Sequence, residues 1–128
     1  MKRGGILHPG LNHLLASTGH TDYFTICDRG FPVPDGPPRI DLALVDDLPT
    51  VLDVLEAVHA EFIIDRIVVA EEMTTFSPAR LAAMRSLLGE VRIEAVSHLA
   101  LKELSADAKA TVRTGDTCAY ANLIVVSG

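Results

Sequence analysis

A histidine and an aspartate stand at the two ends of one short apolar run near the start of the chain. In GHTDYFTICDRGFPVP, residues 19–34, His20 precedes the run and Asp28 follows it. An imidazole titrates near pH 6.5 and suits acid–base work, whereas a carboxylate can accept hydrogen bonds from a ligand hydroxyl or from turn amides. The prolines that follow indicate either ordinary punctuation of the fold or a rigid frame that holds both groups beside a pocket.

Two further polar pairs lie in the second half of the chain. In CAYAN, Tyr120 and Asn122 are two residues apart, so on an extended chain their side chains point the same way. A phenol and an amide on one face suit a small polar ligand such as a sugar, or they cap the edge of a strand. His98 and Lys102 in SHLALKEL are four residues apart and share one helix face, either as a polar pocket wall or as a solvated surface.

The remaining histidines and acidic residues favour no metal site. The spacing of His8, His13 and His20 does not align metal ligands on one helical turn. Glu71 and Glu72 follow an apolar run that is typical of a strand. Neighbouring strand residues point to opposite faces, so at most one of these two carboxylates faces a pocket. No nucleophile-elbow, dinucleotide-binding or phosphate-loop motif occurs.

Length and charge restrict the class of protein. The 128 residues are 48% apolar, which favours a single domain over residues 1–128 with a substantial core. The net charge of −6 comes from scattered acidic residues without a basic stripe, which argues against nucleic acid or a membrane surface as a partner. The start of the chain has no apolar signal segment, no run is long enough to span a bilayer, and Cys27 and Cys118 lack a CxxC spacing. These features predict a cytoplasmic protein with reduced thiols.

Strand and helix patterns alternate along the chain. Apolar and β-branched runs predict strands at residues 23–28, 40–44, 65–73, 91–96, 109–116 and 120–127. Helical spacing predicts helices at residues 11–19, 48–62, 77–89 and 97–108. Gly19 follows the first helix, Pro49 falls in the first turn of the second, and Ser77 and Ser97 suit the N-caps of the last two. We therefore expect an α/β domain built on a mixed β-sheet with helices on both faces.

Taken together, several stretches resemble the D-ribose pyranase family, a group related to L-fucose mutarotase. The matching stretches are MKRGGILHPGLNHLLASTGHTD, CDRGFPVP, RIDLAL, VVAEEM, SHLALKEL, RTGD and YANLIVVSG. GHTD, RID and the Ala121 inside YAN resemble the ribose branch, since the fucose branch usually has glycine between that tyrosine and asparagine. The match departs from the family pattern between Ser77 and His98, where this chain is several residues shorter, and it stops early at Gly128.

The resemblance implies an enzyme that acts on a free aldose without metal or cofactor. The ribose branch interconverts the β-pyranose and β-furanose forms of D-ribose, and the fucose branch exchanges anomers. By matched motif, His20 corresponds to the family's proton donor. The family's substrate-binding positions correspond to Asp28, His98, Tyr120, Ala121 and Asn122. The family assembles into ring-shaped homo-oligomers, often decamers, with sites close to subunit contacts.

Two other functions remain open on the sequence. One is an enzyme of the fucose branch, or one that acts on another aldose. The other is a sugar-binding or regulatory module without turnover. Exchange between sugar forms, followed by NMR with ribose and with fucose, distinguishes the three.

Overall fold

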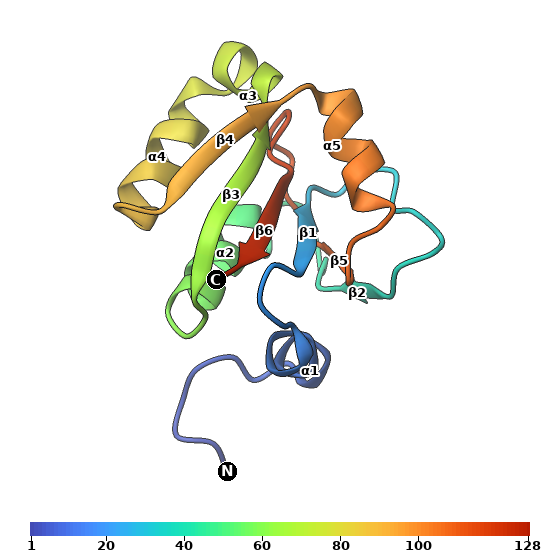
Figure 1. The fold of residues 1–128 in the computed structure, drawn as a ribbon, viewed down its shortest axis with the longest axis vertical. Helices are drawn as coiled ribbons and strands as arrows, with labels where there is room; N and C mark the ends of the chain where they lie inside the picture. The colour runs from blue at the N-terminus through green and yellow to red at the C-terminus, as the bar shows by residue number, and fades with distance from the viewer.

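A six-stranded mixed sheet forms the centre of the fold. The computed structural model describes residues 1–128. The strands are β1 (Tyr23–Cys27), β2 (Arg39–Asp41), β3 (Ile64–Ala70), β4 (Arg92–Val96), β5 (Thr111–Arg113) and β6 (Leu123–Ser127). They lie side by side in the order β2-β5-β1-β6-β3-β4 (Figure 1). β6 is antiparallel to its neighbours β1 and β3, whereas the other pairs of strands are parallel.

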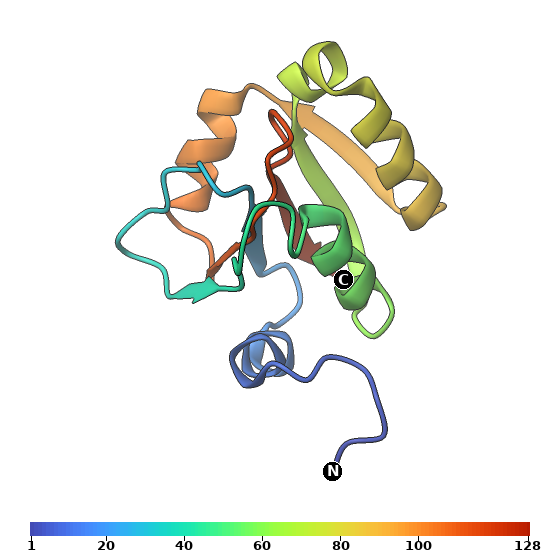
Figure 2. The same ribbon diagram turned by 180° about the vertical axis from the view of Figure 1, so that it is seen from behind.

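Helices cover the two faces of the sheet unequally. α2 (Val51–His59) and α4 (Pro78–Leu88) lie on one face, and α5 (His98–Ser105) lies alone on the other (Figures 1 and 2). α1 (Pro9–Ser17) lies beyond one end of the strands, and α3 (Glu71–Phe76) follows β3 at the opposite end. The expected α/β architecture with helices on both faces is confirmed. None of these helices is both long and apolar enough to cross a membrane.

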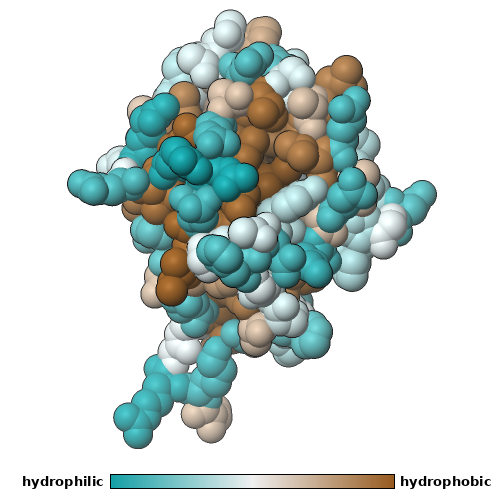
Figure 3. All heavy atoms as spheres, in the orientation of Figure 1, coloured by the Kyte–Doolittle hydropathy of each residue, from teal (hydrophilic) through white to brown (hydrophobic).

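The central strands carry apolar side chains on both faces. On the α2–α4 face, Ile67 and Val69 of β3 join a core cluster of 19 buried residues. On the α5 face, Val68 packs with Leu101 of α5 and Ile124 of β6 in a smaller cluster. Figure 3 shows apolar side chains gathered in the upper half of this second face. The nearly continuous apolar runs of β3 and β6 are therefore explained by burial from both sides.

The two ends of the sheet differ in what they bring together. Because β1 to β5 all run in one direction, their C-terminal ends meet at one end of the sheet, where α3 lies at the top of Figure 1. The residues just before β6 reach the same place, since β6 runs the other way. We call this the C-terminal end of the sheet. The turn between α1 and β1, residues 18–22, lies at the opposite N-terminal end.

Several predicted boundaries are wrong for identifiable local reasons. Glu71 and Glu72 do not continue the strand but form the first turn of α3, so the rule of opposite strand faces does not apply to them. Pro49 precedes the N-cap of α2 rather than lying in its first turn, because the Thr50 hydroxyl accepts the Asp53 N–H in a capping box. The strand predicted at residues 40–44 is confined to Arg39–Asp41.

Candidate active site

Asp28 is the first residue after β1, at the C-terminal end of the sheet. Its Oδ1 accepts the Gly30 N–H at 2.9 Å, which closes the turn expected after the strand. Its own N–H donates to Oδ1 of Asn122 at 2.8 Å, so the two residues are locked together across the sheet. Burial raises the pKa of Asp28, although the hydrogen bonds from Gly30 and Asn122 act against this. The result is a half-buried carboxylate with a fixed direction and remaining acceptor capacity.

His98 is the first residue of α5 and faces the same end of the sheet. Ser97 caps the helix through its hydroxyl. The His98 backbone N–H donates to both carboxylate oxygens of Glu72, each of which lies 3.1 Å from the nitrogen. Burial and the nearby Lys102 ammonium lower the pKa of His98, while Glu72 and Asp28 oppose this. The imidazole is therefore neutral near pH 7. Its Nδ1 is buried and makes no hydrogen bond within the chain.

Tyr120 lies in the loop before β6 and contacts two other aromatic rings. Its ring meets the His98 imidazole edge-on at 5.1 Å and stacks on Phe76 at 5.2 Å between centroids. The backbone of Tyr120 has φ +54°, in the left-handed region. The prediction that Tyr120 and Asn122 point the same way along an extended chain is therefore wrong. The turn instead directs Tyr120 toward His98 while Asn122, beyond the buried Ala121, contacts Asp28.

A buried ion pair anchors the loop that carries Tyr120. Asp116 is fully buried and accepts hydrogen bonds from the Arg80 guanidinium of α4. The same carboxylate accepts the Val51 N–H at 2.8 Å and the Cys118 N–H at 2.9 Å. These hydrogen bonds hold the pKa of Asp116 below its ordinary value even though burial pushes it upward. The RTGD turn is therefore an anchor between the loop, α2 and α4.

His20 does not join this group within one chain. It lies exposed in the turn before β1, at the N-terminal end of the sheet, and no hydrogen bond involves its side chain. The five residues of β1 separate it from Asp28, and at about 3.3 Å per residue such a strand spans roughly 15 Å. The interpretation of residues 19–34 as a frame that holds both groups beside one pocket is therefore wrong for a single chain.

His8 serves local structure, and His13 makes no comparable contact. Nδ1 of His8 accepts the Leu11 N–H at 3.2 Å and caps α1, while His13 lies exposed on that helix. No three His, Cys, Asp or Glu side chains are grouped in a way that could hold a metal ion.

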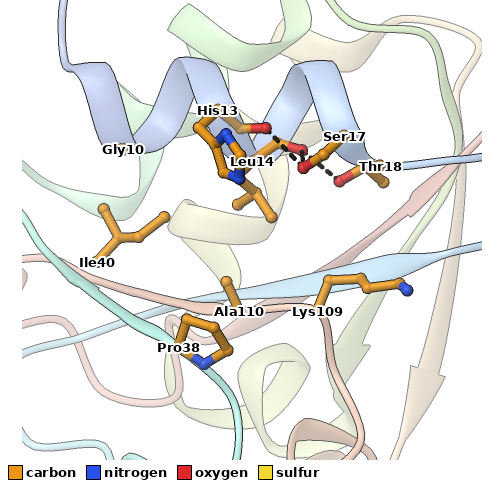
Figure 4. Close-up of a pocket in the computed structure, with 9 residues that line it drawn as sticks. All are labelled: Gly10, His13, Leu14, Ser17, Thr18, Pro38, Ile40, Lys109 and Ala110. Carbon is orange, nitrogen blue, oxygen red and sulfur yellow. Dashed lines mark hydrogen bonds between the residues drawn. The ribbon is translucent and has the colours of Figure 1, made fainter.

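The largest cavity of the chain lies away from the group around Asp28. It has a volume of about 310 Å³ and lies between α1 and the beginnings of β2 and β5, as Figure 4 shows. His13, Leu14 and Lys109 line it together with other residues of α1 and of the Pro38–Ile40 segment. None of the cavities is lined by Asp28, His98, Tyr120 or Asn122. In one chain Asp28, His98 and Tyr120 are partly exposed and line no enclosed pocket, whereas Asn122 is buried behind them.

Sequence reasoning missed the residues that shape this surface. Phe31 contacts the His98 ring at 6.3 Å between centroids, Phe76 stacks on Tyr120, and Glu72 holds the start of α5. Phe31 lay in the proline-rich turn and Phe76 next to a helix boundary, and neither position has a periodic pattern that indicates a site. The sequence predicts Glu72 as a strand residue that could face a pocket, not as the helical residue that holds the start of α5.

Three comparisons place the chain among known proteins. A family model described as the RbsD / FucU transport protein family matches residues 1–128. A D-ribose pyranase of Geobacillus thermodenitrificans is 46% identical over 128 residues, which cover all of this chain and 97% of that protein. The structure of Bacillus subtilis RbsD complexed with D-ribose is 39% identical, with a TM-score of 0.95 over 100% of this chain and 98% of that one. A Streptococcus pneumoniae fucose mutarotase in complex with L-fucose shares the fold, at 22% identity and a TM-score of 0.79 over 95% and 93% of the two chains.

Proposed function

This chain belongs to the RbsD / FucU transport protein family, and from that premise we propose that it interconverts the β-pyranose and β-furanose forms of D-ribose. The observation that carries the proposal is the convergence of Asp28, His98, Tyr120 and Asn122 at the C-terminal end of the sheet. A carboxylate, a neutral imidazole, a phenol and an amide supply both donors and acceptors for a polyhydroxylated ligand. The ribose-bound relative and the pyranase relative favour ribose over fucose as that ligand.

The reaction needs only proton transfers. Opening the pyranose breaks the bond between C1 and the ring oxygen, which gains a proton, while the anomeric hydroxyl loses one and becomes the aldehyde oxygen. Reclosure through the C4 hydroxyl forms the furanose: that hydroxyl adds to C1 and loses its proton, and the aldehyde oxygen regains one. A positioned acid–base group contributes about 10²- to 10⁴-fold to such a step. No redox change occurs, so no nicotinamide or metal is required by the chemistry.

His20 is the proton donor in this proposal, and the groups around Asp28 hold the sugar. Asp28 accepts a hydrogen bond from a sugar hydroxyl, and the half-buried His98 ring offers Nε2, since its Nδ1 is buried. Tyr120 adds its phenol to the binding surface, and the buried Asn122 supports that surface by accepting the Asp28 N–H. A second copy of the chain must bring His20 to this surface, since its own copy holds it at the other end of β1.

A head-to-tail homo-oligomer meets this requirement. Contact between the N-terminal end of one copy and the C-terminal end of the next is heterologous, and repeated contacts of this type form a ring when the rotation between copies closes. The second copy would also cover exposed apolar side chains at the C-terminal end, namely Leu44, Val45, Leu48, Phe76 and Leu99. The family resemblance favours a ring-shaped assembly such as a decamer. Light scattering that returned a monomer at micromolar concentration would rule this out.

The two free cysteines fit a cytoplasmic location, which we include in the proposal. Cys27 is buried in β1, and burial, with the nearby Asp28 carboxylate, raises the pKa of its thiol to about 12. Such a thiol stays protonated and unreactive. Cys118 is partly exposed and is not paired with Cys27.

Saturation-transfer NMR on ribose and fucose tests the proposed activity. We expect enzyme-dependent exchange between the pyranose and furanose signals of ribose. Exchange confined to the anomers of fucose would assign the chain to the other branch. Saturation of bound sugar without any enhanced exchange would indicate a binding module without turnover. Loss of ribose exchange on EDTA treatment, with recovery on adding a divalent ion, would contradict the metal-free mechanism.

A further inference from the structure

Two consecutive residues at the junction of α3 and α4 hold two consecutive residues of the site loop. The Phe76 ring stacks on the Tyr120 ring with an angle of 29° between their planes. The Ser77 hydroxyl donates a hydrogen bond of 2.6 Å to the Ala119 carbonyl. The junction therefore contacts both the side chain of Tyr120 and the backbone immediately before it.

Ser77 stands where a serine ordinarily caps a helix, but it does not cap α4. The sequence predicts it as the N-cap because Pro78 follows it, yet its side chain makes no capping hydrogen bond. Its backbone, at φ −140° and ψ 54°, lacks the extended conformation usual at an N-cap, and its hydroxyl donates to the loop instead. The local stability of α4 thus does not account for this hydroxyl, and its contact with Ala119 does.

Tyr120 needs support of this kind because of its backbone. A non-glycine residue with φ of +54° occupies a sparsely populated region, which persists only where the surroundings enforce it. The Asp116–Arg80 ion pair fixes the loop four residues earlier, and Asn122 is fixed by its hydrogen bond with Asp28. Between these two anchors, Phe76 and Ser77 contact the Ala119–Tyr120 pair from one side, and the His98 ring meets Tyr120 edge-on.

We propose that Phe76 and Ser77 are positioning residues that place the Tyr120 phenol in the sugar-binding surface. For the sugar, this inference rests on the proposed function. Both act through Tyr120, so their loss weakens substrate and transition state alike. The expected signature is a rise in KM for ribose with little change in kcat. An aromatic pair or a hydrogen bond of this type corresponds to about a two- to tenfold rise for each residue.

The chain offers a clean optical reporter for Tyr120. It contains no tryptophan and only two tyrosines, so a Tyr23→Phe parent leaves Tyr120 as the only tyrosine. In that parent we expect Phe76→Ala and Ser77→Ala each to weaken the near-ultraviolet tyrosine circular dichroism band without sugar present. Ser77→Thr retains a hydroxyl and should preserve the band. Thr75→Ala is the matched control, because Thr75 is exposed on α3 and makes no side-chain hydrogen bond.

A double-mutant cycle with Tyr120 separates positioning from direct sugar contact. Phe76→Ala should raise KM in the parent but add no further rise in a Tyr120→Ala background. An additive rise in both backgrounds would overturn the inference, as would an unchanged tyrosine band in both Phe76→Ala and Ser77→Ala. A parent without ribose exchange would refute the proposed function, and the tyrosine band would then still decide whether the junction positions Tyr120.

Discussion

The two ends of β1 hold the side chains of the proposed site in opposite ways. At the C-terminal end, Asp28 is tied to Gly30 and Asn122, and His98 is tied through its backbone to Glu72. At the N-terminal end, His20 lies in an exposed turn and its side chain makes no hydrogen bond. The fixed groups match the demands of binding, where donors and acceptors must be aligned before the sugar arrives. The unattached histidine matches a group that one copy presents to another.

The largest expected effect is a loss of ribose exchange on mutating His20, at the N-terminal end of the sheet. His20→Ala should lower the ribose exchange rate by about 10²- to 10⁴-fold, because the acid–base contribution is lost. The free energy of unfolding and the size of the assembly should change little, since the side chain is exposed. NMR measures the exchange rate, thermal unfolding measures the change in stability, and light scattering measures the size of the assembly. His13→Ala, an exposed histidine on α1 at the same end, should retain normal exchange. Near-normal exchange in His20→Ala would place the donor elsewhere, with His98 as the next candidate.

At the C-terminal end of the sheet, the main expected effect is a loss of unfolding free energy. Asp116→Asn leaves the Arg80 guanidinium without its buried partner, and breaking such a pair costs about 3–5 kcal/mol of unfolding free energy. Asp46→Asn is the matched control, because the Asp46–Arg29 pair is exposed and a pair of this kind contributes about 0–1 kcal/mol. Denaturant unfolding compares the two variants. Equal small losses in both would mean that Asp116 does not anchor the loop.

Acid should reduce the difference between the wild type and Asp116→Asn. The pKa of Asp116 is lowered in the folded chain: burial alone would raise it, but the hydrogen bonds from Arg80, Cys118 and Val51 prevail. A lowered carboxyl pKa contributes stability above the ordinary pKa, and this contribution is lost as the pH falls through the folded value. The wild type should therefore lose stability below about pH 4 more steeply than the variant. Parallel curves across that range would contradict the shift.

Asp28→Asn should weaken sugar binding more than it slows proton transfer. The asparagine can still accept the Gly30 N–H, but it lacks the charge that strengthens a bond to a sugar hydroxyl. We expect KM for ribose to rise about tenfold, with a smaller change in kcat. Because burial raises the pKa of Asp28, the wild-type KM should also rise as the pH falls toward that pKa, and the variant should not show this. Asp35→Asn, on an exposed loop, is the control. A fall in kcat with unchanged KM would assign Asp28 to the chemical step instead.

The smallest expected effect concerns the charge beside His98. Burial and Lys102 lower the pKa of His98, so Lys102→Gln should raise that pKa toward the ordinary histidine value. Titration of the imidazole signals by NMR measures the change. Glu103→Gln, which alters an exposed neighbour on the same helix, should leave the His98 titration in place. A downward movement in Lys102→Gln would contradict the assigned role of the ammonium.

Local patterns predicted the fold better than the site. The apolar runs of β3 and β6 and the Ser97 cap of α5 act over a few neighbouring residues, so their signals are readable in one sequence. The meeting of Asp28 with Asn122, 94 positions later, depends on strand order, which no local pattern encodes. The left-handed turn at Tyr120 was missed because no glycine or asparagine occupies that position. The separation of His20 from Asp28 within one chain follows from the strand between them, so the idea of one frame for both groups was wrong for a single chain.

Mixing two variants with complementary defects tests most directly whether each site combines two copies. His20→Ala retains an intact C-terminal end, and Asp28→Ala retains an intact His20. We expect Asp28→Ala, which removes the hydrogen-bonding group altogether, to show little exchange at a ribose concentration well below its KM. When the two variants are dissociated and reassembled together in equal amounts, a head-to-tail contact should restore about one quarter of the sites, and ribose exchange by NMR should recover to about that level. Mixed oligomers, verified by native mass spectrometry, that show no recovery would contradict a site shared between copies.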